Sequence, residues 1–155
     1  MLLNSSYSGS TVCHTGYDKA DYSNISFVAR LDKLVEEGFF DKNRVDTVIV
    51  FGGTNDSWAG VPMGEIQRSN WTKEDLYSFR PACCYLIDKL KQLVPNVIVV
   101  VNSEISQEVI DTLKTVATEY GATMVALDKI SKICGHPIFE GMTQIKNAIV
   151  ETLSK

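Results

Sequence analysis

Three short apolar runs, each followed by a polar turn, constrain the fold of this 155-residue chain more than any other feature. They cover residues 45–51, 96–101 and 123–127 and are rich in β-branched residues. Runs of this length without polar alternation are typical of parallel strands that are buried on both faces. The sequence therefore predicts a parallel sheet that is covered on both sides.

Helical patterns lie between and after these runs. Apolar residues repeat at helical spacing over residues 26–37, 81–94, 106–120 and 141–153. Gly38 and Gly121 follow two of these segments as stop signals, and Pro81 suits a first helical turn. The alternation of strands and helices predicts a doubly wound α/β fold, with an α/β/α arrangement of three layers.

The length of the chain predicts a single domain over residues 1–155. Leu2-Leu3 is expected as one more short strand, and residues 54–77 as the longest loop. A net charge of −4 argues against a nucleic-acid partner, which a basic face would attract. No apolar stretch approaches the roughly 18 residues of a membrane span, and no signal peptide is recognised. We therefore expect a cytoplasmic location and no membrane partner.

Three polar segments follow strands or open the last helix, at residues 4–11, 52–57 and 135–137. In open α/β sheets, ligands bind beyond the carboxyl ends of the strands. Asn55 follows two glycines there, so its amide is able to stabilise an oxyanion together with a backbone N–H. The alternative is that Asn55 and Asp56 only form a turn. Asp56 is expected as a helix cap or hydrogen-bond acceptor.

His136 stands between Gly135 and Pro137, which restrict the backbone on both sides. A general base needs a side chain held in this way, although a histidine that caps the last helix is the alternative. His14 lies in a loop and is expected to be structural or exposed. The four cysteines show no metal-ligand spacing, so no metal site is expected.

The segment Asn4–Thr11 resembles the phosphate loop of flavodoxins, whose amides and hydroxyls hold the phosphate of FMN. In that family a helix starts directly after the loop, whereas residues 13–22 delay it here. An FMN-binding protein of the flavodoxin type is therefore an alternative function.

All three segments together resemble the blocks of the SGNH (GDSL-like) hydrolases. Asn4–Thr11 matches the second block, Gly53–Asp56 the Gly-x-Asn-Asp block, and His136-Pro137 the last block. The resemblance implies a flavodoxin-like fold and a serine esterase or acylhydrolase that needs no cofactor. It also implies a small-molecule or carbohydrate ester as the substrate, with deacetylation of sugars as one such reaction.

The resemblance implies roles for individual residues. Gly9 would give a backbone N–H and Asn55 an amide N–H to the oxyanion, and His136 would be the base. The family often places an aspartate three residues before this histidine, where the chain has Ile133. Asp128 is the nearest upstream candidate to orient the imidazole.

The first block of the family, Gly-Asp-Ser on the first strand, has no match in this sequence. We therefore expect a chain that is truncated at its N-terminus, lacks the first central strand and has little or no esterase activity. A serine recruited from Ser5, Ser6, Ser8 or Ser10 is the alternative. The missing strand would leave a gap beside residues 45–51, and a homodimer through this gap is one way to close it.

Both tryptophans, Trp58 and Trp71, lie in the expected long loop. They are candidates for a sugar-stacking wall, with core packing as the alternative for each. A non-catalytic binding protein that keeps the hydrolase fold is a further functional alternative.

Overall fold

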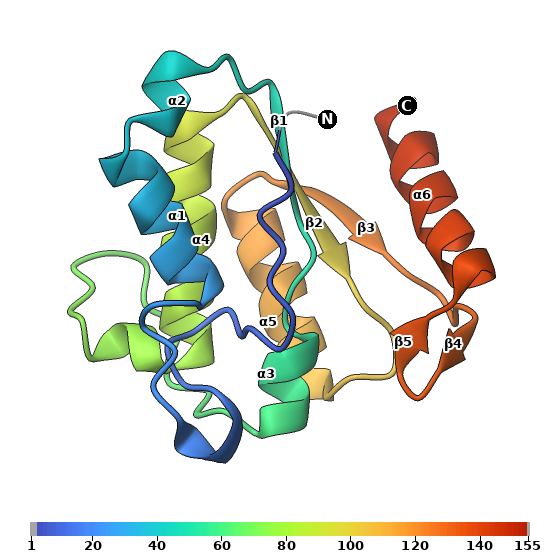
Figure 1. Cartoon of the computed structure of the whole chain (residues 1–155), viewed down its shortest axis with the longest axis horizontal. Helices are drawn as coiled ribbons and strands as arrows, with labels where there is room; N and C mark the ends of the chain where they lie inside the picture. Colours follow the sequence, from blue (N-terminus) through green and yellow to red (C-terminus); the bar gives the residue numbers. More distant parts are fainter. Residues whose placement is uncertain (1–2, 155) are drawn as a thin grey trace.

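The computed structural model describes residues 3–154 of the chain. Its central element is a parallel sheet in the order β1 (Thr47–Val50), β2 (Asn96–Val101) and β3 (Thr123–Ala126) (Figure 1). The three predicted runs are confirmed as strands, and β2 begins and ends at the predicted residues.

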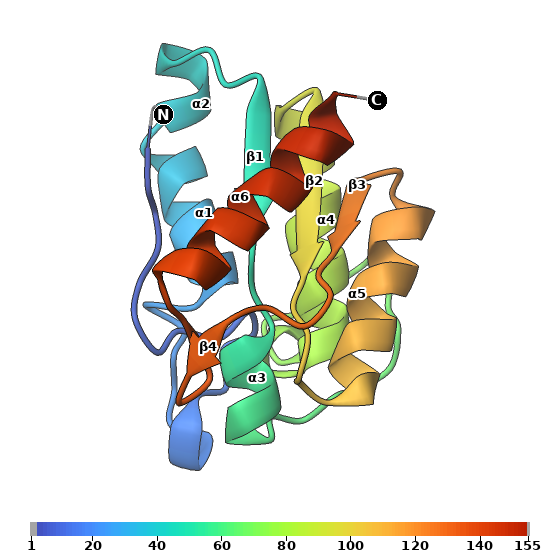
Figure 2. The ribbon, with the colours of Figure 1, turned by 90° about the vertical axis from the view of Figure 1, so that its right-hand side faces the viewer.

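Helices form layers on both sides of this sheet (Figures 1 and 2). One layer holds α1 (Phe27–Glu36), α4 (Phe79–Leu93) and α5 (Gln107–Glu119), and α2 (Phe39–Lys42) follows α1. The opposite layer holds α6 (Phe139–Leu153). The predicted α/β class with its three layers is confirmed, and each predicted helix is present with ends shifted by a few residues.

The side chains of β2 divide between two hydrophobic clusters. Val97, Val99 and Val101 belong to a large cluster built with α1, α4 and α5. Ile98 and Val100 point to the other face, into a small cluster with residues of α6. Because both faces of β2 are covered, five of its six residues are buried, as the sequence predicted.

The prediction that every strand is buried on both faces is wrong for β1 and also for β3, in which Val125 is the one buried residue. Thr47 and Ile49 are exposed, and Ile49 keeps 50% of its surface accessible. The physical reason is that α6, the helix on this side of the sheet, makes its main sheet contacts with β3 and leaves these side chains of β1 uncovered. Burial of a strand face depends on the helix that covers it, and the strand sequence does not specify that helix.

The segment expected as a long loop contains a short helix, α3 (Thr54–Ala59), and a 3₁₀ turn at Asp75–Tyr77. Left-handed glycines flank α3, Gly53 before it and Gly60 after it. Six residues are too few to show a helical repeat, which explains why the sequence pattern missed it. Leu2 lies outside the described residues, and Leu3 is not part of a strand.

No helix within residues 3–154 has the length and apolar character needed to cross a membrane.

Candidate active site

Two glycines fix the start of α3 at the carboxyl end of β1. A Cβ atom on Gly52 would lie 2.7 Å from the ring of Phe27, and one on Gly53 would lie 2.9 Å from Val109. Gly53 also has φ +94°, a conformation that side chains other than glycine rarely adopt. Close packing therefore requires both glycines, and it sets the direction in which α3 leaves the sheet.

Asn55, the second residue of α3, has its amide held at both ends. Its Nδ2 donates to the carbonyl oxygen of Ser10 at 2.8 Å, and its Oδ1 accepts from the hydroxyl of Tyr17 at 2.9 Å. These two bonds fix which end of the amide carries the N–H groups. Within residues 3–154 the second N–H of Asn55 has no partner and is available to a ligand.

Gly9 lies in the turn that Asn55 contacts. The N–H of Ser10 donates to the carbonyl of Tyr7 at 3.3 Å, and Gly9 between them has φ +77°. The Asn55–Ser10 bond therefore brings the turn of Gly9 and the amide of Asn55 together, although 45 positions separate Asn55 from Ser10 in the sequence.

Asp56 anchors the segment after this turn. Its carboxylate oxygens each lie 2.9 Å from the N–H of Val12, and Oδ1 also accepts from the N–H of Cys13 at 3.3 Å. The side chain is buried, with 1% exposure. Burial raises the pKa of Asp56 to about 6, while the N–H donors of Val12 and Cys13 oppose the shift. The expected role of Asp56 as a hydrogen-bond acceptor is confirmed.

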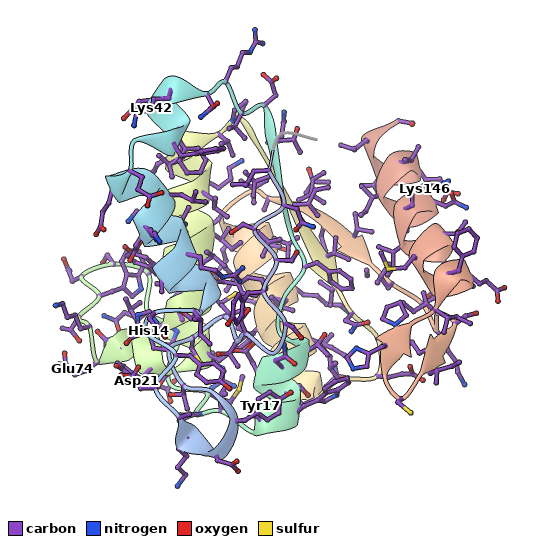
Figure 3. All side chains as sticks on the ribbon, viewed as in Figure 1. His14, Tyr17, Asp21, Lys42, Glu74 and Lys146 are labelled. Atoms are coloured by element: carbon purple, nitrogen blue, oxygen red, sulfur yellow. The ribbon has the colours of Figure 1, made fainter. Side chains whose placement is uncertain are left out.

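Tyr17 comes from the loop of residues 13–22, the segment that delays the first helix, and no role in the site was expected for it. The loop closes through the bridge of Thr15 with Asp21, and Figure 3 shows Tyr17 beside α3. At its tip, Asp18 and Lys19 both have positive φ, 53° and 59°. Consecutive left-handed residues other than glycine are costly and are found most often at functional sites. Burial raises the pKa of Tyr17, so its hydroxyl stays a donor to Asn55.

His136 is presented by a small hairpin formed by β4 (Lys132–Ile133) and β5 (His136–Pro137). The two turn residues, Cys134 and Gly135, have φ 49° and 77°, as in a type I′ turn. His136 is exposed, and within residues 3–154 its ring makes no hydrogen bond to a carboxylate or carbonyl. Asp128 is exposed in the segment after β3 and does not bond to His136.

Trp58 of α3 lies against this hairpin. Its ring stands edge-on to the imidazole of His136, with centroids 5.7 Å apart and an interplanar angle of 90°. A Cβ on Gly135 would fall within 2.5 Å of the same indole, so a side chain there would displace it. The contact brings together α3, which carries Asn55, and the hairpin that carries His136.

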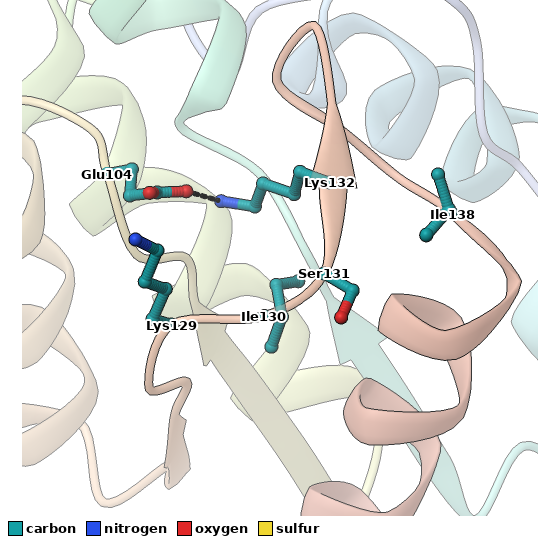
Figure 4. Close-up of a pocket in the computed structure, with 6 residues that line it drawn as sticks. All are labelled: Glu104, Lys129, Ile130, Ser131, Lys132 and Ile138. Carbon is teal, nitrogen blue, oxygen red and sulfur yellow. Dashed lines mark ion pairs between the residues drawn. The ribbon is translucent and has the colours of Figure 1, made fainter.

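Lys132 was not predicted from the sequence. Its side chain is 7% exposed, and its ammonium lies among Asn102, Ser103 and Glu104 in the loop after β2. Figure 4 shows its ion pair with Glu104. A lone lysine in an ordinary loop gives no pattern that would indicate such a role.

The remaining candidates lie elsewhere. His14 is buried with its Nδ1 2.8 Å from the hydroxyl of Ser26, and burial lowers its pKa. The expected structural role of His14 is therefore confirmed. Trp71 packs edge-on against Tyr85 of α4 and donates from Nε1 to the carbonyl of Gln67. It belongs to the periphery of the large cluster rather than to the surface around His136.

An α/β fold that places an oriented asparagine amide and an exposed histidine beyond a parallel sheet is the type of scaffold found in hydrolases that act on acyl groups. The sequence matches the family described as GDSL-like lipase/acylhydrolase over residues 1–153. The chain therefore belongs to the GDSL-like lipase/acylhydrolase family, a family of ester hydrolases.

Two solved structures are similar to the chain. A protein of Bacteroides uniformis ATCC 8492, assigned as a GDSL-like lipase, is 49% identical, with a TM-score of 0.87 over 96% of this chain and 67% of that protein. A protein of Bacteroides ovatus ATCC 8483 with the same assignment is 38% identical, with a TM-score of 0.85 over 94% of this chain and 68% of that one. No curated protein matches the chain.

Proposed function

We propose that the chain supplies the oxyanion donors and the base of a serine ester hydrolase. The observation that carries the proposal is the fixed amide of Asn55, which leaves one N–H free beside the turn of Gly9. In the proposed reaction, Asn55 and the N–H of Gly9 donate to the oxyanion. His136 takes the proton of the attacking group and returns it to the leaving alcohol.

Acetylated sugars are the substrate class we propose. Trp58 supports this choice, because its indole is 44% exposed beside His136 and offers an apolar face for a sugar ring. Trp71 does not contribute, since it packs against Tyr85.

We propose further that residues 1–155 alone hydrolyse esters poorly, because the sequence has no Gly-Asp-Ser block. Ser10 is a weak replacement: it is 3% exposed, and its hydroxyl accepts from Arg30 at 3.0 Å. The test is p-nitrophenyl acetate hydrolysis by the purified chain, which we expect to equal that of His136→Ala. Hydrolysis that is lost in His136→Ala would show instead that the chain holds its own nucleophile.

A chimera tests the roles of Asn55 and His136. The part of the Bacteroides uniformis protein outside the match is fused to this chain, and hydrolysis of p-nitrophenyl acetate and an acetylated sugar is measured. We expect an active chimera in which Asn55→Ala and His136→Ala each lower kcat by about 10²-fold or more. A chimera that keeps its activity in either variant would contradict the assigned role. Sugar binding without turnover would support the non-catalytic alternative.

A further inference from the structure

The ammonium of Lys132 is enclosed by acceptors from one loop. Nζ donates to Oδ1 of Asn102 at 3.1 Å and to the carbonyl of Ser103 at 2.9 Å, and it pairs with Oε2 of Glu104 at 3.2 Å. Ser103 Oγ lies at 3.5 Å. A buried ammonium costs several kcal/mol unless its hydrogen bonds are all made. Lys132 therefore holds the hairpin to this loop through several partners, of which Figure 4 shows the ion pair with Glu104.

The same loop is bonded to α3. Nδ2 of Asn102 donates to Oγ1 of Thr54 at 2.8 Å, and the N–H of Ser106 donates to Oγ of Ser57 at 2.8 Å. Asn102 is 5% exposed, so water competes little for its bonds. A continuous polar chain thus runs from Lys132 through Asn102 to Thr54, the residue directly before Asn55.

The hairpin that Lys132 begins has little to stabilise it by itself. Each of its strands has two residues, and an isolated hairpin is marginal even when longer. Its position relative to α3 is therefore set by its contacts. The N–H of Ser131 ties the start of the hairpin to Oε1 of Gln144 in α6 at 2.8 Å. Lys132 supplies a polar contact with the loop that is bonded to α3, and Trp58 supplies the apolar contact at Gly135 and His136.

From these contacts we infer that Lys132 is a positioning residue that holds His136 against α3, at a fixed place relative to Asn55. The catalytic meaning of this position rests on the proposed function. The position of His136 does not rest on the proposed function, because the fluorescence of Trp58 reports its contact with His136 without any reaction.

The test uses the fluorescence of Trp58 in the Trp71→Phe protein, which has no other tryptophan. A protonated imidazole quenches an indole in contact with it, so the addition of acid lowers the emission of Trp58 as long as His136 stays against it. The quenching step is lost in His136→Gln, which separates it from the titration of His14. We expect Lys132→Met to lose the step as well, and Lys132→Arg to restore it.

Lys129→Met is the matched control, because Lys129 is exposed three residues earlier in the same segment. It should keep the full quenching step. Circular dichroism checks that each variant is folded, and Asn102→Ala, which breaks the link to Thr54, serves if Lys132→Met does not fold. We expect Asn102→Ala to weaken the step. The inference is overturned if folded Lys132→Met shows the full acid quenching of Trp58. If Lys132→Met does not fold, the same result in Asn102→Ala overturns it.

The chimera separates this inference from the proposed function. If Lys132→Met loses the quenching of Trp58 while the chimera is inactive, the positioning role of Lys132 is supported and the proposed esterase function is refuted. An active chimera in which Lys132→Met has unchanged kcat and an unchanged quenching step would refute the positioning role alone.

Discussion

The two faces of the sheet are built from similar apolar strands but are covered to different degrees. Within residues 3–154, twenty-two buried residues form the cluster on the side of α1, α4 and α5, and six form the cluster on the side of α6. Ile49 and Phe51 keep 50% and 36% of their surface on the sparsely covered side of β1. On α6, Met142, Val150 and Leu153 are each more than half exposed. Apolar strand sequence alone therefore does not ensure burial.

The difference bears on the candidate site because the site draws on both sides. α3 starts from glycines packed against Phe27 and Val109, in the well-covered layer. The hairpin of His136 leads directly into α6, on the less covered side of the sheet. Asn55 is therefore held by the well-packed layer of α1, α4 and α5. The position of His136 depends on local contacts, among them those of Lys132 and Trp58.

The largest expected effect comes from the well-covered face. Ile87 of α4 is 1% exposed inside the large cluster. Ile87→Ala removes buried methyl groups and leaves a cavity, so we expect a loss of about 2–5 kcal/mol in the free energy of unfolding. Urea denaturation followed by circular dichroism measures it. A loss no greater than that of an exposed isoleucine would contradict the contrast between the faces.

The second prediction concerns the carboxylate buried on the well-covered side. Its pKa in the folded chain is about 6, above the ordinary 3.8, so the folded state takes up the proton first as the pH falls. Ionisation of Asp56 above pH 6 therefore lowers the stability of the fold relative to the protonated form, and this cost disappears as the pH falls from 6 to below 3.8. The difference between the two pKa values of Asp56 corresponds to about 3 kcal/mol.

Urea denaturation of the wild type and Asp56→Asn over this pH range isolates the effect. The difference in stability, wild type minus variant, should grow as the pH falls. The lowered pKa of His14 acts in the opposite direction in both proteins and cancels in the difference. If the difference in stability between the wild type and Asp56→Asn is constant with pH, burial does not raise the pKa of Asp56 in the folded chain.

The third prediction concerns the stability of α6 as a unit. Ile145 is 5% exposed in the small cluster, so it matches Ile87 in type and burial. We expect the amides of α6 to exchange with deuterium through local opening, at a lower free energy than those of α4. Ile145→Ala should lower the opening energy of α6 by about 2 kcal/mol and leave α4 nearly unchanged. Equal exchange in the two helices would argue against independent opening.

These contrasts show what the sequence was able to predict. The strand β2 and the stripes of α4 and α5 follow from local hydropathy. Asn55 and His136 remain candidates that the sequence indicates through polar residues that follow a strand or open the last helix. Tyr17 and Lys132 were not predictable in this way. Their bonds join residues 38 and 30 positions apart, and neither belongs to a local pattern. The exposure of Ile49 depends on where α6 packs, which is also a property of the assembled fold.

The smallest effect on stability is expected from Ile49→Thr. This change also tests directly the face of the sheet that α6 covers only in part. Ile49 is half exposed, so the change should alter the free energy of unfolding by less than about 0.5 kcal/mol. It should nevertheless reduce the binding of an apolar fluorescent dye, because Ile49 lies among the exposed apolar residues of this face.

Met124→Thr is the matched control for this change. Met124 is 40% exposed, but its register with Val99 places it on the opposite face of the sheet, over the well-covered layer. Dye binding should stay near the wild-type level in that variant. If both variants reduce dye binding equally, the dye responds to any exposed apolar side chain. If only Ile49→Thr reduces it, the apolar surface that the dye recognises lies on the face that α6 covers only in part.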